Sequence, residues 1–522
     1  MILGLLLAAG SAALGGALAL AAQRHRGLLE MTRTFAFAAA AGVVAFHLLP
    51  EVLPELGPTA LLWIAAGFAL PWILEAGARA VGPGVLERRG MRGMRVAAEV
   101  GFVALVFHSL FEGLALLATL QARENRTDLE IAIVAHHAPL TAAVALPFLD
   151  LLGVRGALVR VGLIALAGAV GVVGGTLVPG LASGADAGVL QRATAVVAGA
   201  LLHVVADEVR EQRFSSIAHR AGDLLAAGVG LTLAGIGAFL DLRNTAGVVG
   251  FARTAAALAL AAAPALLLSI AAEAAAKRVP GVQPLRGRAE GILATGALLG
   301  WVAAGVRLAL TLLLALVLWL AGRRAPERGR ISMLDELTPR GPWLLMLLAV
   351  AASVDVLAPP GWFAGLGPAG LVVVAALLGL SAQASASGGA LLACALVHRG
   401  LPAELAVPFL ALGSLPVRGT SPARALAGIA VGFSAALGGA ELLTRTSVLH
   451  GAATAASNVL ARASHPVLEQ AAAAPLSAAC VTLLLALGLL LVWRSGVRGW
   501  FRPLRHPDLR ERPARHAPAE AR

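Results

Sequence analysis

The sequence predicts an all-α polytopic membrane protein. Hydrophobic residues make up 58% of its 522 residues and charged residues only 13%, about half the charged fraction of an average soluble domain. Mean hydropathy is +0.83, and apolar runs of about twenty residues, long enough to cross a bilayer as helices, recur along most of the chain. A membrane β-barrel would show short segments of alternating polarity instead. We therefore expect the lipid bilayer to be the main partner.

The first half is predicted to form an eight-helix bundle, with arginine concentrated in the loops on one side. The predicted helices are 1–22, 34–56, 59–81, 96–120, 129–152, 157–179, 187–209 and 222–241. The arginine-rich loops hold Arg24, Arg26, Arg33, Arg88, Arg89, Arg92, Arg95, Arg155, Arg160, Arg210, Arg213 and Arg220, and the other side has only Arg123 and Arg126. Arginine is enriched in cytoplasmic loops, so the N-terminus is expected outside. The Ala-, Gly- and Arg-rich usage is typical of a high-GC bacterial genome, which suggests a bacterial inner membrane.

The net charge of +12 does not indicate nucleic-acid binding. The excess arginines lie between apolar runs and in the C-terminal tail, and no basic patch interleaved with aromatic residues accompanies them. The two cysteines, Cys394 and Cys480, lie in apolar runs and indicate neither a disulfide framework nor a CxxC metal site.

A second helical membrane module is predicted at 253–493, after a short linker at 242–252. Its apolar runs include 291–322, interrupted by "GWVAAGVR", and 369–397, interrupted by "SAQASASGG". Interrupted hydrophobic segments point to broken or re-entrant helices, which in transporters line a cavity. Residues 494–522 are rich in Arg and Pro and are expected to form a disordered cytoplasmic tail.

Three first-half helices carry a histidine and an acidic residue four positions apart, which places both side chains on one helix face. The pairs are His47 with Glu51, His108 with Glu112 and His203 with Asp207, and a fourth helix holds His136 and His137. Ionisable side chains are costly inside a bilayer and mark a site or a pathway. One such histidine could equally hydrogen-bond a neighbouring carbonyl, but three pairs and a His-His step favour a shared function.

Imidazole and carboxylate together suit a divalent cation. Zinc takes nitrogen and oxygen ligands, and iron, nickel or manganese would accept a similar set. At about 1.5 Å per residue, the histidines of the fourth and fifth helices fall near the middle of the membrane, and the other pairs fall toward its two faces. This order predicts an ion pathway with entry at His47 and Glu51 and exit at His203, Asp207 and Glu208.

Residues 1–241 resemble the ZIP (Zrt/Irt-like) family of divalent metal transporters. The resemblance rests on "HSLFEGLAL" at 108–116 in the fourth helix, on His-x-x-Pro at 136–139 in the fifth, and on eight helices with both ends outside. "HVVADEV" at 203–209 is similar to the family's seventh helix. The resemblance implies a central metal site formed by helices four and five, with Pro139 unwinding helix five. Carried over, its residues are His108, Ser109, Glu112, His136 and His137.

The chain departs from the family at Leu140, where a Glu or His ligand usually follows the proline. A site of His108, Glu112 and His136 keeps three ligands, and His137 could help, but a binuclear site is not expected. The loop 84–95, which is often His-rich in the family, has no histidine. A metal-sensing cytoplasmic loop is therefore not indicated.

The second half resembles, more weakly, bacterial permeases of the two-repeat type related to organoarsenical efflux proteins. The stretch that carries this resemblance is "LLGLSAQASASGGALLACALVHRGLPAELAVPFLALGSLPV" at 377–417. Where the motif of those permeases contains cysteine, this sequence has Ser381, Ser385 and Ser387. Binding of a soft metal through thiolates is therefore not expected. The Gly- and Ser-rich interruption "SAQASASGG" within this stretch is equally consistent with close helix packing and with substrate contact.

The leading functional prediction is a transporter that imports zinc or a similar divalent ion into the cytoplasm, not an enzyme. An intramembrane metal-dependent hydrolase is one alternative, although HExxH is absent and no Ser-His-Asp set is apparent. A non-transporting scaffold or regulator is another, favoured by Leu140 and by the eroded permease motif. A homodimer also remains open.

Overall fold

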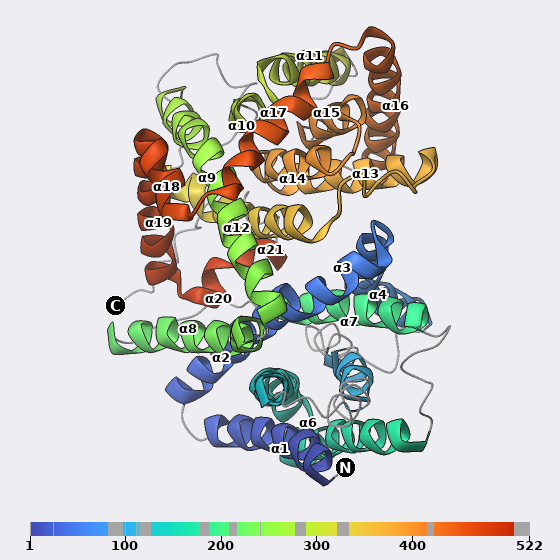
Figure 1. Cartoon of the computed structure of the whole chain (residues 1–522), viewed down its shortest axis with the longest axis vertical. Coiled ribbons are helices and arrows are strands. Elements are labelled where there is room, and N and C mark those ends of the chain that lie inside the picture. The colour runs from blue at the N-terminus through green and yellow to red at the C-terminus, as the bar shows by residue number, and fades with distance from the viewer. Residues whose placement is uncertain are drawn as a thin grey trace, which may run out of the picture. The chain divides into compact units, whose positions relative to one another are not determined.

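The computed structural model describes residues 2–23, 26–81, 98–99, 101–110, 113, 127–177, 187–207, 217–240, 242–276, 289–320, 333–414 and 422–505. Helices make up nearly all of these ranges, and no strand occurs in them (Figure 1). Within the same ranges, six helices are long and apolar enough to cross a membrane. The chain is therefore an all-α, multi-pass membrane protein, as its composition predicts.

The chain divides into two compact units. Residues 1–248 and 492–501 form unit 1, and residues 249–491 and 502–522 form unit 2. The division falls inside 242–252, but the loop predicted there is wrong, because α9 (Leu242–Ala276) is helical through that stretch. Asn and Gly cost a helix only about 1 kcal/mol or less each, too little to stop a helix between two apolar segments.

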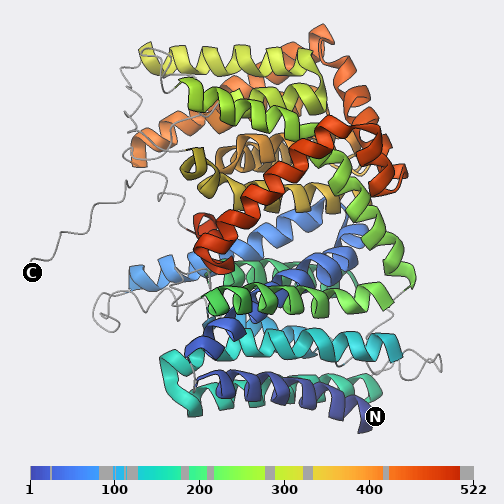
Figure 2. The same cartoon turned by 90° about the vertical axis from the view of Figure 1, so that its left-hand side faces the viewer.

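Unit 1 is built from helices that pack in pairs. Its elements are α1 (Ile2–Gln23), α2 (Arg26–Val43), a π-helical turn (Val44–Leu48), α3 (Leu49–Leu56), α4 (Thr59–Val81), α6 (Thr127–Leu177), α7 (Ala187–Asp207) and α8 (Ile217–Leu240). α1 lies along α6, α2 along α8, and α4 along α7 (Figures 1 and 2). α6 holds two helical segments that meet at Gly153, whose φ of 69° and ψ of −174° are not helical. These segments correspond to the predicted spans 129–152 and 157–179.

Prolines in unit 1 change helices without ending them. Pro50 has no N–H to donate to a carbonyl one turn earlier, and the chain before it widens into the π-helical turn Val44–Leu48. The expectation that Pro139 unwinds its helix is wrong, because Gly153 is the non-helical residue within α6. In an apolar environment, unwinding would expose further backbone groups that water cannot satisfy.

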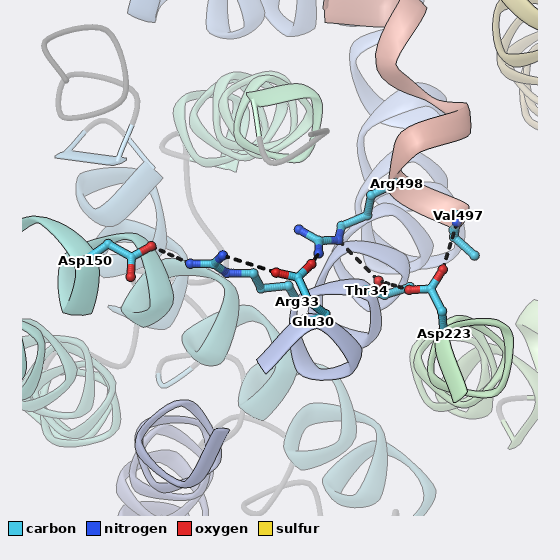
Figure 3. Close-up of polar contacts among 7 residues, drawn as sticks. All are labelled: Glu30, Arg33, Thr34, Asp150, Asp223, Val497 and Arg498. Carbon is cyan, nitrogen blue, oxygen red and sulfur yellow. Dashed lines mark hydrogen bonds and ion pairs between the residues drawn. The ribbon is translucent and has the colours of Figure 1, made fainter. Parts of the chain in front are cut away.

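The C-terminal segment of unit 1 is fixed by a polar network (Figure 3) and by an apolar contact. Arg498, on α20 (Val497–Trp500), pairs with Glu30 and donates from Nε to Oγ1 of Thr34 at 3.2 Å. Thr34 donates to Asp223, which also accepts the N–H of Val497 at 2.8 Å. Phe37 and Phe501 pack with their ring centroids 5.5 Å apart.

The prediction of a disordered tail from 494 is therefore wrong for its first part. α20 and α21 (Arg502–Arg505) are helical, and Arg498 is only 1% exposed. Composition suggested disorder because Arg and Pro are frequent there, but a tertiary ion pair compensates the charge of Arg498. Residues 506–522 lie outside the described residues.

Unit 2 contains the broken helices that the sequence predicted. Its remaining elements are α10 (Ala289–Leu299), α11 (Trp301–Leu320), α12 (Met333–Leu357), α13 (Pro368–Ala384), α14 (Ala386–His398), α15 (Ala403–Ala411), α16 (Pro422–Thr446), α17 (His450–Ala461), α18 (Val467–Ala473) and α19 (Pro475–Ser495). Gly300, with φ of 90°, separates α10 from α11. Ser385, in extended conformation, separates α13 from α14 and accepts the N–H of Gly388 as the N-cap of α14. Both predicted interruptions are confirmed.

Candidate functional site

Three helical segments of unit 1 meet at the imidazole of His137. Ser11 on α1 places its Oγ 2.7 Å from Nδ1, and Ser109, in the helical segment 101–110, places its Oγ 2.8 Å from Nε2. All three side chains are at most 2% exposed. Both ring nitrogens of a predicted site histidine therefore have a hydroxyl partner from another helix.

The hydrogens at this centre can be counted. Ser11 can also donate to the carbonyl of Ala8 at 3.0 Å, and Ser109 to that of Leu105 at 2.8 Å. Each hydroxyl has one hydrogen, and a neutral imidazole has one N–H and one accepting nitrogen. One serine therefore accepts from the ring, and the other donates to it in place of its own carbonyl. The accepting nitrogen has the lone pair that a metal ion would use if that serine moved aside.

Two further buried polar residues neighbour members of this centre along the chain. Thr141 follows it by four positions on α6, which puts both on one helix face. Thr141 is 0% exposed, and its Oγ1 has no hydrogen-bond partner among the described residues. His108 precedes Ser109 and is 6% exposed. A hydroxyl without a partner in a buried polar site requires explanation, and an ion or a water at this centre would provide one.

A glycine allows α1 to approach α6 at this point. An added Cβ at Gly15 would lie 2.3 Å from the carbonyl oxygen of Ala138 and 2.8 Å from Cβ of Thr141. Ser11 lies one turn before Gly15 on the same face of α1. The contact between Ser11 and His137 therefore depends on the absence of a side chain at Gly15.

The glycine dependence can be tested within α1. We expect Gly15→Ala to lower the free energy of unfolding by about 1–3 kcal/mol, because the new methyl group overpacks the contact with α6. Gly10→Ala is the matched control, since no atom lies within 4 Å of a Cβ added there. The thermal midpoint of each purified variant in detergent measures the difference, and equal midpoints would contradict the close approach.

The structure gives the other predicted site residues different settings. His203 on α7 is 6% exposed, with Nδ1 2.9 Å from the carbonyl oxygen of Phe68 on α4. Glu51 on α3 is exposed. The backbones of His47, His136 and Asp207 are helical, but their side chains lie outside the described residues, as do Glu112 and Glu208 entirely.

The metal site is not completed by the described residues alone. No group of three or more His, Cys, Asp or Glu side chains gathers within the ranges that the structure describes. Leu140, which stands where a family ligand was expected, is 0% exposed and belongs to the apolar core of unit 1. Ser11 and Thr141 were not predicted, since hydroxyls in apolar helices are common. Only the fold brings Ser11 to His137, whereas the spacing of four positions could have indicated Thr141.

Unit 2 has its own buried polar cluster beside the broken helices. Glu290, in the first turn of α10, pairs with Arg340 at 2.8 Å and accepts a hydrogen bond from Ser387. Arg307 on α11 donates to the carbonyl of Gly291 and to Oγ1 of Thr295, each at 2.7 Å. Glu290 and Arg307 are both 4% exposed.

Comparisons of the chain with protein-family models, with curated proteins and with solved structures find no match.

Proposed function

We propose that unit 1 carries a divalent metal ion across the membrane, with zinc as the expected substrate and iron, manganese or nickel as further candidates. His137 and His108 would bind the ion, with Ser109 and Thr141 beside them. The residues outside the described set, Glu112 and the side chain of His136, would complete the ligands as the ZIP-like sequence motif implies. We also propose that the protein lies in a bacterial inner membrane with its N-terminus on the outer side.

The observation that carries this proposal is the buried centre at His137. An imidazole joined to two serines on other helices, next to an unpartnered threonine hydroxyl, is an expensive arrangement inside an apolar helix bundle. Metal-binding histidines commonly donate their second ring N–H to a fixed oxygen, which sets the tautomer. Ser11 suits that role, because it faces Nδ1, while Ser109 faces Nε2.

A non-transporting membrane scaffold is the second candidate, and one observation favours it. The hydrogen bonds from His137 to Ser11 and Ser109 satisfy both ring nitrogens without any ion. In that case the centre ties three helices together and nothing passes through it. Purified protein that contains and binds no divalent ion, by elemental analysis and equilibrium dialysis, would support this reading.

Zinc uptake by proteoliposomes tests the transport proposal. The wild-type chain should accumulate radioactive zinc, and His108→Ala combined with His137→Ala should reduce uptake to the level of empty liposomes. His450→Ala is the control, since this exposed histidine begins α17 in unit 2. Uptake should also fall at acid pH, because protons compete with the metal for the imidazole nitrogens. Undiminished uptake by the double variant would disprove the site.

A further inference from the structure

Unit 2 gathers an acid, an imidazole and a hydroxyl from three different helices. Asp355 lies near the end of α12, His398 is the last residue of α14, and Ser457 lies on α17. Nε2 of His398 is 3.7 Å from Oδ1 of Asp355, and Nδ1 is 3.2 Å from Oγ of Ser457. No Ser-His-Asp set was apparent in the sequence, because only the fold brings these three residues together.

Asp355 is fixed by two other side chains. Arg399 donates from Nε to Oδ1 at 3.1 Å, and Thr254 on α9 donates to Oδ2 at 3.3 Å. The guanidinium of Arg399 also reaches the main-chain carbonyl of Asp355. Oδ1 of Asp355 lies beyond hydrogen-bond distance of Nε2, at 3.7 Å, and acts on the imidazole through its negative charge, which favours a hydrogen on that nearer nitrogen. The lone pair of Nδ1 then points to Ser457, whose hydroxyl donates to it.

Exposure increases along the set from acid to hydroxyl. The side chain of Asp355 is 6% exposed, that of His398 is 27% exposed, and Ser457 lies on an exposed part of α17. An accessible hydroxyl, a base within hydrogen-bond reach and a buried group that orients the base are the parts of an activated nucleophile. A helix-packing contact would not require the hydroxyl to be accessible.

We propose that Ser457 is a nucleophile toward carboxylic esters, with His398 as its general base and Asp355 as a positioning residue. Oγ of Ser457 attacks the carbonyl carbon while its proton passes to Nδ1 of His398. The carbon–oxygen bond to the alcohol then breaks, and the alcohol leaves with that proton, so that the acyl group remains on Ser457. Water, activated by the same base, hydrolyses the acyl-serine to a carboxylic acid and restores the hydroxyl.

A fluorophosphonate probe tests the nucleophile on the purified full-length chain. The serine oxygen displaces fluoride from phosphorus, so the probe marks an activated serine irrespective of its natural substrate. We expect labelling at Ser457, found by mass spectrometry, with loss in Ser457→Ala and a decrease of roughly 100-fold in His398→Gln. Ser464 is the internal control, because it is also exposed but donates to the carbonyl of Ala461 at 2.7 Å. Labelling of Ser457 no faster than Ser464 would overturn the proposal.

Two further variants separate a positioning role from a structural one. Asp355→Asn should lower the maximal inactivation rate by the probe while the probe concentration for half-maximal rate stays unchanged, and Asp355→Glu should restore part of the rate. Ser457→Cys should react with iodoacetamide faster than the same variant combined with His398→Gln, because His398 accepts the thiol proton. Equal alkylation rates in these two folded variants, or Asp355→Asn labelling at the wild-type rate, would count against the assigned roles.

Discussion

Arg498→Met should lower the free energy of unfolding of unit 1 by about 1–3 kcal/mol, because it removes the buried charged member of a polar network, while its ion-pair partner Glu30 is 45% exposed and stays hydrated. The guanidinium is 1% exposed, pairs with Glu30 and reaches Asp223 through the hydroxyl of Thr34. Without Arg498, the carboxylate of Asp223, which is 2% exposed, would lose the nearby charge that compensates its burial. The methionine would keep much of the volume and none of the charge.

The control for this variant is Arg445→Met. Arg445 pairs with Glu441 one turn earlier on α16 at 2.8 Å, but both side chains are more than 60% exposed. Exposed pairs of this kind contribute about 0–1 kcal/mol, so the thermal midpoint should barely move. Limited proteolysis of Arg498→Met should also cut the chain near 497–500 faster than in the wild type. A midpoint shift no larger than that of the control would contradict the role of the network in Figure 3.

The fold could be predicted from sequence where a local pattern determines it. Apolar runs gave the all-α membrane class, and Gly- and Ser-rich interruptions gave the breaks that the structure has at Gly300 and Ser385. The loop at 242–252 and the disordered tail were wrong for one reason. Both were predicted from composition, whereas helix continuity and the ion pair of the buried Arg498 with Glu30 decide those segments.

The candidate site could be predicted in its histidines and in Ser109, which belongs to the motif at 108–116. A histidine in an apolar run stands out by its chemistry, so His137 was found without a structure. Ser11 lies 126 positions away from it, and only the close crossing at Gly15 makes it a partner. The same limit applies to Asp355, His398 and Ser457. They lie on three different helices and meet only in the fold, so no spacing along the chain indicates them.

Glu290→Gln should destabilise unit 2 by about 3–5 kcal/mol, although it changes neither the size of the side chain nor its capacity to accept a hydrogen bond from Ser387. Glu290 is the acidic partner of Arg340 at 2.8 Å, and its charge also acts on Arg307. The variant would leave two guanidinium groups in a buried cluster without that carboxylate. It would also remove a negative charge from the first turn of α10, where a helix favours one.

Glu441→Gln is the matched control, since it makes the same chemical change in an exposed pair, and we expect it to shift the thermal midpoint little. A double-mutant cycle with Arg340→Met would isolate the pair itself. If the loss arises from uncompensated charge, adding Arg340→Met to Glu290→Gln should recover part of the stability, because one of the two cations that Glu290 compensates disappears. If the loss arises from packing, the double variant should be less stable than either single one. Uncompensated charge thus predicts that the double variant is more stable than Glu290→Gln, and lost packing predicts that it is less stable. A double variant that is less stable would contradict the role assigned to the charge of Glu290.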